Sequence, residues 1–323
     1  MTDYDIAIVG AGPAGLSAAL YAARFCRSVL VLHDGTARAA RIPLTHNAPG
    51  FDGGIAGPDL LERMTRHPVK YGARVVEARV DSAEWTGANF RLASDSGTSW
   101  YARSVILATG VALNQVPLDP ATHEAAIAHG VLRYCPVCDG YEHRGERIAV
   151  LGCDVSGAAE ALFLKTFSDD VTLLPRHDVD LTETERAELE AAGIVIVADP
   201  VERYEPTADA MIVHLAGHAE PQVFDVLYPA LGSRPRNRLA QQLGLTLDPD
   251  GRAPGNSPFQ TEIPGLYCAG DLVDGLDQIS VAMGHGAVAA TKAHNWLRAR
   301  DGETVQAVLE REVQEGSAAE GSG

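Results

Sequence analysis

An apolar strand that runs directly into a glycine-rich turn is the feature that most constrains this chain. Residues 5–9, DIAIV, are typical of a buried β-strand, and GAGPAG follows at once at 10–15. Residues 16–25 then favour a helix, and SVLVLHD at 28–34 predicts a second strand that ends in an acid. A strand, turn, helix and strand in this order bind a dinucleotide, because the helix N-terminus attracts its pyrophosphate.

Each small residue of the turn has a physical task in such a unit. Gly10 permits the tight turn, Gly12 lets the backbone approach the pyrophosphate, and Gly15 lets the helix pack closely on the strand. Asp34 stands where a carboxylate that binds the ribose belongs. We therefore expect the dinucleotide to be bound by Gly10, Gly12, Pro13, Ala14, Gly15 and Asp34.

Charge and composition exclude several classes of protein. The net charge of −17 argues against a nucleic-acid partner, whose phosphates must be neutralised by basic residues. No apolar run approaches the roughly 18 residues of a membrane span, so we expect no membrane partner. The start, MTDYDIAIVG, has acids and no basic leader, and the five cysteines are an odd number. We expect a cytoplasmic protein with reduced thiols.

The stretch YCPVCDGYE at 134–142 holds the one close pair of cysteines, Cys135 and Cys138. A zinc site needs about four ligands, and His143 supplies only a third, so we expect no metal. A structural pair and a redox pair both remain open from spacing alone. Pro136 fits the first position of a helix, where amides favour thiolate, and Asp139 can move the proton that thiol exchange releases.

Two later stretches complete a three-part pattern. SVILATG at 104–110 and IPGLYCAGDLVD at 263–274 are strands that end in glycine turns, as in flavoproteins with two dinucleotide-binding domains. Over nearly its whole length the chain resembles the low-molecular-weight thioredoxin reductases. The resemblance implies an α/β fold of two Rossmann-like domains, the second inserted into the first. It places a split FAD domain at 1–113 and 236–300 and an NADPH-type domain with the CxxC at 114–235, and it implies a homodimer.

The resemblance also implies roles for individual residues. Asp271 would hold the FAD ribityl chain, Asn47 of NAPG would lie beside the flavin, and Cys138 would face it. Cys135 would then exchange with the substrate, and Asp139 would be the acid–base group. The remaining residues expected to bind FAD are Thr109, Gly110, Gly270, Gln278 and Ile279. The small, polar end of the chain, 310–323, is expected to be disordered.

The chain departs from the family where NADPH would bind. The turn GCDVSG at 152–157 has Cys153 and Asp154 where the family has glycines, which crowds and repels a pyrophosphate. Of the family's basic cluster for the 2′-phosphate only Arg176 remains, between Pro175 and His177. Two further departures border the flavin. Asp277 replaces an arginine, and TARAARIP at 36–43 replaces Gly-Gly-Gln.

These observations predict an FAD-dependent thiol–disulfide oxidoreductase that does not use NADPH as its normal donor. It would be a dithiol oxidase, or an enzyme linked to ferredoxin or to a second flavin or other nucleotide in the 114–235 domain. Its partner would be a thioredoxin-like protein or a small dithiol. The alternatives are an NADPH-dependent thioredoxin-disulfide reductase and a non-enzymatic flavin or redox sensor. His143 and His285 are candidates for further proton carriers.

Overall fold

The computed structural model describes residues 3–152, 154–255 and 261–305. These residues form two compact units. The first unit comprises the chain up to residue 40, residues 58–111 and the chain from 235 onward, and the second comprises 41–57 and 112–234. Cys153 and the tail 310–323, for which disorder was expected, lie outside the described residues. The domain boundaries drawn from the sequence stay predictions.

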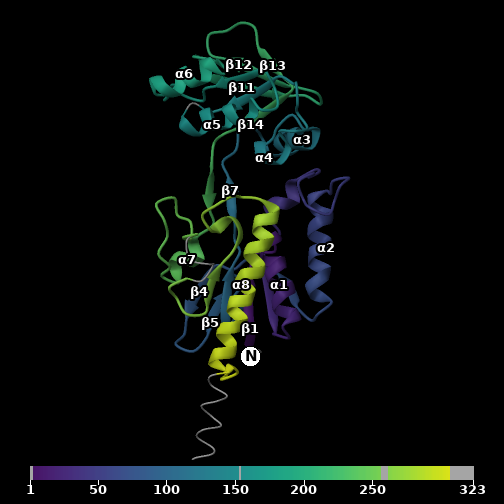
Figure 1. Ribbon diagram of the computed structural model, residues 1–323, viewed down its shortest axis with the longest axis vertical. Coiled ribbons are helices and arrows are strands. Elements are labelled where there is room, and N and C mark those ends of the chain that lie inside the picture. The colour runs from purple at the N-terminus through teal and green to yellow at the C-terminus, as the bar shows by residue number, and fades with distance from the viewer. Residues whose placement is uncertain (1–2, 153, 256–260, 306–323) are drawn as a thin grey trace, which may run out of the picture. The chain divides into compact units, whose positions relative to one another are not determined.

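The first unit is built on a mainly parallel sheet (Figure 1). Its order is β3-β2-β1-β6-β5-β4, and β16 pairs with β6 beyond the end of β5. β1, β2, β3, β6 and β16 pair with one another in parallel, whereas β5 is antiparallel to both β4 and β6. The strands are β1 (Asp3–Val9), β2 (Val29–His33), β3 (Arg74–Glu77), β4 (Ser82–Trp85), β5 (Phe90–Ala93), β6 (Ser99–Leu107) and β16 (Leu266–Cys268).

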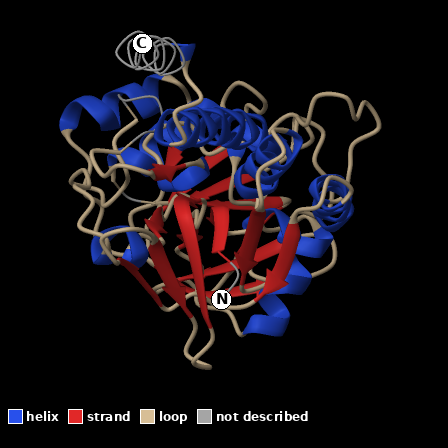
Figure 2. Ribbon diagram, turned by 90° about the horizontal axis from the view of Figure 1, so that it is seen from below, coloured by secondary structure: helices blue, strands red, loops and turns tan. Residues whose placement is uncertain are grey.

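Helices cover this sheet because its strands are apolar on both faces. One core joins Ile6 and Ile8 of β1 to the alanines of α1 and α8, and the other face has a core of its own. Figure 1 shows α8 beside α1, and Figure 2 shows the helices in blue against the strands in red. The helices are α1 (Pro13–Arg24), α2 (Gly57–Val69), α7 (Arg238–Gln242) and α8 (Ile279–Arg300), with 3-10 turns η1 (Arg38–Arg41) and η2 (Gly270–Leu272).

The second unit combines a parallel and an antiparallel sheet. The parallel order is β10-β9-β8-β14, and the antiparallel order is β11-β12-β13. Its strands are β8 (Ile148–Leu151), β9 (Val171–Leu174), β10 (Val195–Ile196), β11 (Val201–Pro206), β12 (Met211–Leu215), β13 (Gln222–Phe224) and β14 (Val226–Pro229). Its helices are α3 (Pro120–His129), α4 (Pro136–Asp139), α5 (Val155–Leu164) and α6 (Glu183–Ala191). The two connecting segments, β7 (Val111–Leu113) and β15 (Ser233–Pro235), pair with each other.

The predicted fold class is confirmed: both units have a parallel sheet that begins with a strand, a glycine turn and a helix. A capping box begins α6, since the Thr182 hydroxyl accepts from the Glu185 amide and the Glu185 carboxylate accepts from the Thr182 amide. In the described part of the chain, no helix is both long and apolar enough to cross a membrane.

The packing of α1 against α8 yields a test with a matched pair of glycines in one helix. A Cβ at Gly286 of α8 would lie 2.1 Å from the carbonyl oxygen of Ala14, so the Gly286→Ala variant must push the helices apart. We expect it to lose about 1–3 kcal/mol of unfolding free energy, as overpacked cores do. The measurement is the midpoint of denaturant unfolding followed by circular dichroism.

Gly284→Ala is the control. No atom of the described residues lies within 4 Å of a Cβ at Gly284, which also belongs to α8. That variant should gain about 0.4–1 kcal/mol, because alanine restricts the unfolded chain. Equal stability of the two variants would contradict the close approach of α1 and α8.

Candidate active site

The residues expected to bind FAD, apart from Asn47, lie at one edge of the first unit's sheet. The carboxyl ends of parallel strands lie at the same edge, and a ligand binds there. The glycine turn follows β1, Asp34 follows β2, and Thr109 and Gly110 follow β6. Gly270 and Asp271 follow β16, and the helix that begins at Ile279 has Gln278 as its N-cap. The topology thus gathers residues that are more than 200 positions apart in the sequence.

The first turn fits a dinucleotide. A Cβ at Gly10 would lie 2.2 Å from the oxygen of Ala108, and a Cβ at Gly15 would lie 1.9 Å from the oxygen of Gly10. Both positions therefore need glycine. Gly12 caps α1 without a side-chain hydrogen bond, and no described atom lies within 4 Å of the place of its Cβ. The first amides of α1 border open space, which suits the pyrophosphate of FAD.

Asp34 is an exposed, ionised carboxylate at the end of β2. Its Oδ1 accepts hydrogen bonds from the amide and the hydroxyl of Thr36, at 3.1 and 2.6 Å. Partial burial opposes its ionisation, but these hydrogen bonds and the charge of Arg236 outweigh burial and lower the pKa of Asp34. Arg236 also donates to the Thr36 hydroxyl, and its carbonyl accepts from the Thr109 hydroxyl at 2.7 Å. The strand ends are thus joined by polar contacts.

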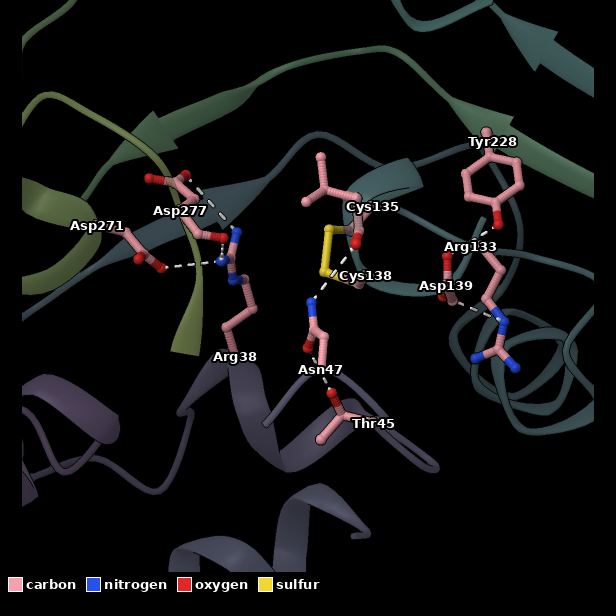
Figure 3. The surroundings of a disulfide bond; sticks show 11 residues. Arg38, Thr45, Asn47, Arg133, Cys135, Cys138, Asp139, Tyr228, Asp271 and Asp277 are labelled. Atoms are coloured by element: carbon pink, nitrogen blue, oxygen red, sulfur yellow. Dashed lines mark hydrogen bonds and ion pairs between the residues drawn. A yellow bond between two sulfur atoms is a disulfide. The ribbon is translucent and has the colours of Figure 1, made fainter. Parts of the chain in front are cut away.

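Asp271 lies in a cluster of four charges with Arg38, Arg252 and Asp277. Figure 3 labels Arg38, Asp271 and Asp277. Its carboxylate is 3.1 Å from Nη2 of Arg38, which also donates to the carbonyl of Asp277 at 3.0 Å. Arg252 holds the Asp277 carboxylate with both terminal nitrogens and donates to the Asp271 carbonyl at 2.7 Å. Burial raises the pKa of Asp271, although Arg38 acts against it. A buried acid with a close cation remains able to accept from a hydroxyl group.

The cluster contains both of the further departures that the sequence analysis placed beside the flavin. Asp277 stands where the family has an arginine, and Arg38 belongs to the segment that replaces Gly-Gly-Gln. In the structure these two residues are paired, so the Asp277 carboxylate balances the charge of Arg38. Sequence analysis did not identify Arg38 or Arg252 as site residues. The signal that could have identified Arg38 was its presence in one segment expected beside the flavin, while Asp277 replaces an expected arginine in the other.

Asn47 lies with the second unit. Its Oδ1 accepts from the hydroxyl of Thr45 at 2.9 Å, and its Nδ2 lies 3.5 Å from the carbonyl oxygen of Val137, a long polar contact (Figure 3). Val137 stands between the two cysteines of the CxxC. The segment that contains Asn47 therefore braces the short helix of the cysteine pair. Its expected place beside the flavin stays a prediction.

Cys135 and Cys138 form a disulfide at the start of α4. Cys135 is the N-cap, Pro136 is the first helical residue, and the Cys138 amide donates to the Cys135 carbonyl at 2.9 Å. This is the helix start that the sequence predicts. Asp139 ends the helix, with its Oδ1 accepting from the Tyr228 hydroxyl at 2.8 Å and its Oδ2 3.5 Å from Nε of Arg133 (Figure 3).

Burial raises the pKa of Asp139, and Arg133 and Tyr228 act against that rise. The result is a carboxyl whose affinity for a proton is increased, next to a pair of sulfurs whose exchange consumes and releases protons. His143 is close enough for its charge to lower the same pKa. Its Nδ1 is 2.7 Å from the Glu146 carboxylate. His285 belongs to α8 of the first unit, where burial lowers its pKa.

The turn after β8 has a glycine at each end, Gly152 and Gly157, but the first amides of the helix that follows are occupied. A Cβ at Gly157 would lie 2.7 Å from the backbone of Gly152, so strand and helix pack as closely as in the first unit. Asp154 is the N-cap of α5, and its Oδ1 accepts from the amides of Ser156 and Gly157 at 3.0 and 3.1 Å. The chain thus places its own carboxylate on the amides that would bind a pyrophosphate.

The surroundings of this turn carry little positive charge. Pro175 is buried at the end of β9, and Arg176 and His177 are exposed beside Asp178. Burial, with the charge of Asp154 adding to it, raises the pKa of Glu160 in α5 to about 7. Within the described residues, no group of three or more histidine, cysteine, aspartate or glutamate side chains could hold a metal ion.

Comparison with known proteins assigns the chain to a family. Residues 4–286 match the pyridine nucleotide-disulphide oxidoreductases, a family that implies FAD and a nicotinamide cofactor. The thioredoxin reductase of Mycolicibacterium smegmatis is 32% identical over 313 residues, which cover 93% of this chain and 98% of that protein. The bifunctional thioredoxin reductase/thioredoxin of Mycobacterium leprae is 31% identical over 330 residues, covering 96% of this chain and 69% of that protein.

A solved structure agrees with these relatives. The thioredoxin reductase from Streptococcus pyogenes MGAS5005 superposes with a TM-score of 0.84 at 26% identity, covering 92% of this chain and 99% of that one. The dinucleotide turn and the CxxC disulfide lie within the matched residues. The chain therefore belongs to the pyridine nucleotide-disulphide oxidoreductase family and is an FAD-dependent disulfide oxidoreductase similar to the thioredoxin reductases.

Proposed function

We propose that this enzyme passes electron pairs between a dithiol–disulfide partner and FAD without NADPH as its normal donor. One observation carries the proposal: the Asp154 carboxylate accepts hydrogen bonds from the Ser156 and Gly157 amides. A helix N-terminus binds a phosphate through such amides and through its positive dipole. In the second unit the amides and the helix dipole already interact with the carboxylate of Asp154.

NADPH would have to displace this carboxylate and then remain beside it. Each charge-assisted hydrogen bond that the phosphate fails to make costs about 1.5–3 kcal/mol, and every 1.4 kcal/mol is a factor of ten in affinity. The exposed Arg176 is a single cation for the 2′-phosphate, in place of a cluster. The residues present do not fit the phosphates of NADPH. Either oxygen, a ferredoxin or a second flavin would then complete the electron path.

The cysteine pair supports exchange with a dithiol partner. A thiolate of the partner attacks Sγ of Cys135, the bond between Cys135 and Cys138 breaks, and Cys138 leaves as a thiolate. The partner's second thiolate then displaces Cys135, so the partner becomes a disulfide and the pair has gained two electrons. Asp139 takes up and returns the protons that the thiols exchange. FAD, when bound by the first unit, supplies the two-electron acceptor or donor for the pair.

A second candidate is an NADPH-dependent thioredoxin-disulfide reductase. It is favoured by the family and its relatives, and by the close approach of Gly152 and Gly157 in the second turn. Both candidates take a dithiol or disulfide substrate, for which we propose a thioredoxin-like protein or a small molecule. The cytoplasmic location and the homodimer also stay predictions.

The two candidates differ in what reduces the flavin. In the absence of oxygen, dithiothreitol should bleach the bound flavin, whereas NADPH should not. Calorimetric titration should give an NADPH dissociation constant no tighter than about millimolar. Asp154→Gly should strengthen NADPH binding roughly ten- to hundredfold, because two amides are freed and one repulsive charge is removed.

Asp119→Gly is the matched control for this test. Asp119 caps α3 in the same unit by accepting from the Thr122 amide at 3.1 Å, so the substitution removes a similar cap elsewhere. It should cost a few tenths of a kcal/mol of stability, as should Asp154→Gly, and leave NADPH affinity unchanged. Micromolar binding of NADPH to the wild type, with rapid bleaching, would establish the second candidate instead.

The two cysteines should differ in their reaction with a substrate disulfide. Cys26 is an exposed free thiol, so every variant is made in a Cys26→Ser background. With glutathione disulfide, Cys138→Ser should accumulate a mixed disulfide on Cys135, since the resolving thiol is missing. Cys135→Ser should accumulate far less. Intact mass and peptide mapping measure the adduct.

Retention of FAD, seen in the absorbance spectrum, shows that both variants remain folded. Equal labelling of the two variants would contradict the division of labour between Cys135 and Cys138. Full turnover of a dithiol by both variants would show that the disulfide is structural.

A further inference from the structure

The two oxygens of the Asp139 carboxylate have different partners. Oδ1 accepts a hydrogen bond of 2.8 Å from the Tyr228 hydroxyl, whereas Oδ2 lies 3.5 Å from Nε of Arg133 (Figure 3). The first contact is a good hydrogen bond, and the second is too long to be one. Asp139 follows Cys138 directly, so the carboxyl group and the disulfide belong to the same short helix.

Tyr228 is a fixed donor. Tyr228 belongs to β14, and its ring is fully buried in the core that β14 shares with β8, β9 and α5. Burial, with the charge of Asp139 adding to it, raises the pKa of Tyr228 above its usual range, so the phenol keeps its proton. A phenol that always donates takes Oδ1 out of proton exchange. It leaves the other oxygen to accept and release the proton.

Arg133 supplies charge to that other oxygen. Its side chain is 19% exposed, and in the described part of the chain its buried Nε has no hydrogen-bond partner. A guanidinium at this distance favours the carboxylate form without occupying the oxygen with a strong hydrogen bond. Arg133 also stands two residues before Cys135, so it belongs to the short segment that leads into the cysteine pair.

We propose that Tyr228 and Arg133 are positioning residues that divide the Asp139 carboxyl, Tyr228 anchoring Oδ1 and Arg133 holding Oδ2 as the oxygen that exchanges protons with the thiols. This inference rests on the proposed role of Asp139 as the acid–base group of the pair. The other charges that act on Asp139 are His143, which is held by Glu146, and Glu142, which opposes His143. The variants below leave these three residues in place.

The direct test is the titration of Asp139, followed by carbon-13 resonance of labelled aspartate and assigned with Asp139→Asn. A hydrogen bond or a cation that favours the charged form lowers a carboxyl pKa. Tyr228→Phe, which keeps the buried ring, should therefore raise the titration midpoint by roughly one pH unit. Arg133→Met should raise it by a similar amount. Arg133→Lys should stay close to the wild type, because it keeps the charge.

Two matched controls separate this effect from a general loss of packing. Tyr204→Phe removes the hydroxyl of another buried tyrosine of the second unit, which belongs to a different core cluster. Arg147→Gln removes an arginine of the same unit that pairs with Asp225 at 2.6 Å. Neither control should move the Asp139 midpoint. Circular dichroism and FAD absorbance report the folding of every variant.

A kinetic measurement links the titration to thiol chemistry. The rate of disulfide reduction by dithiothreitol is measured against pH, and the limb that Asp139→Asn abolishes is assigned to Asp139. That limb should move to higher pH in Tyr228→Phe and in Arg133→Met. In Arg133→Lys it should lie close to its position in the wild type. Unmoved midpoints in both Tyr228→Phe and Arg133→Met would overturn the inference. If one of them does not fold, the other, compared with Arg133→Lys, decides.

Failure of the proposed function gives a different result. If Asp139→Asn leaves the pH profile unchanged, Asp139 is not the acid–base group, and the proposal fails with it. If Asp139→Asn abolishes the limb but the positioning variants leave both readouts unmoved, Asp139 keeps its role and only the division of its oxygens is wrong.

Discussion

The close approach of α1 to its neighbours is the constraint on which the first unit depends. Gly15 lies where a Cβ would be 1.9 Å from the carbonyl oxygen of Gly10, and Gly286 lies where one would be 2.1 Å from that of Ala14. Without side chains at these points, α1 is held tightly against both β1 and α8. Its first amides then stand at the edge where β2, β6 and β16 also end. The expected FAD-binding residues of the first unit lie at or beside that edge.

The two units use the same structural element in opposite ways. The first turn leaves the helix amides open beside Gly12, and the second covers them with the carboxylate of Asp154. In the second unit Gly152 and Gly157 are in close contact, as Gly10 and Gly15 are in the first. The two turns differ in the charge at the helix N-terminus. One chain can thus use the same packing twice while a single cap changes the charge that the helix end presents.

Local patterns in the sequence predicted the strands, turns and helices that carry the expected site residues. The run from Ile6 to Gly15 predicted a strand, a turn and a helix, and the structure has all three. Pairs that are distant in sequence were not predictable, because no local pattern specifies them. Arg38 with Asp277 and Tyr228 with Asp139 are joined only when strands and helices are in place. The contact of Asn47 with the cysteine helix is of the same kind.

The sheet of the first unit is assembled from separated parts of the chain, and this has a consequence for biosynthesis. Along one edge β6 pairs with β5 at residues 99–102 and with β16 at 105–107, and β16 comes from residues 266–268. A ribosome therefore completes 41–57 and 112–234, the whole second unit, before the segment that closes this edge exists. Until then the end of β6 is an exposed strand edge, the kind of surface that recruits other chains. The nascent protein must protect that edge while a later segment is still being made.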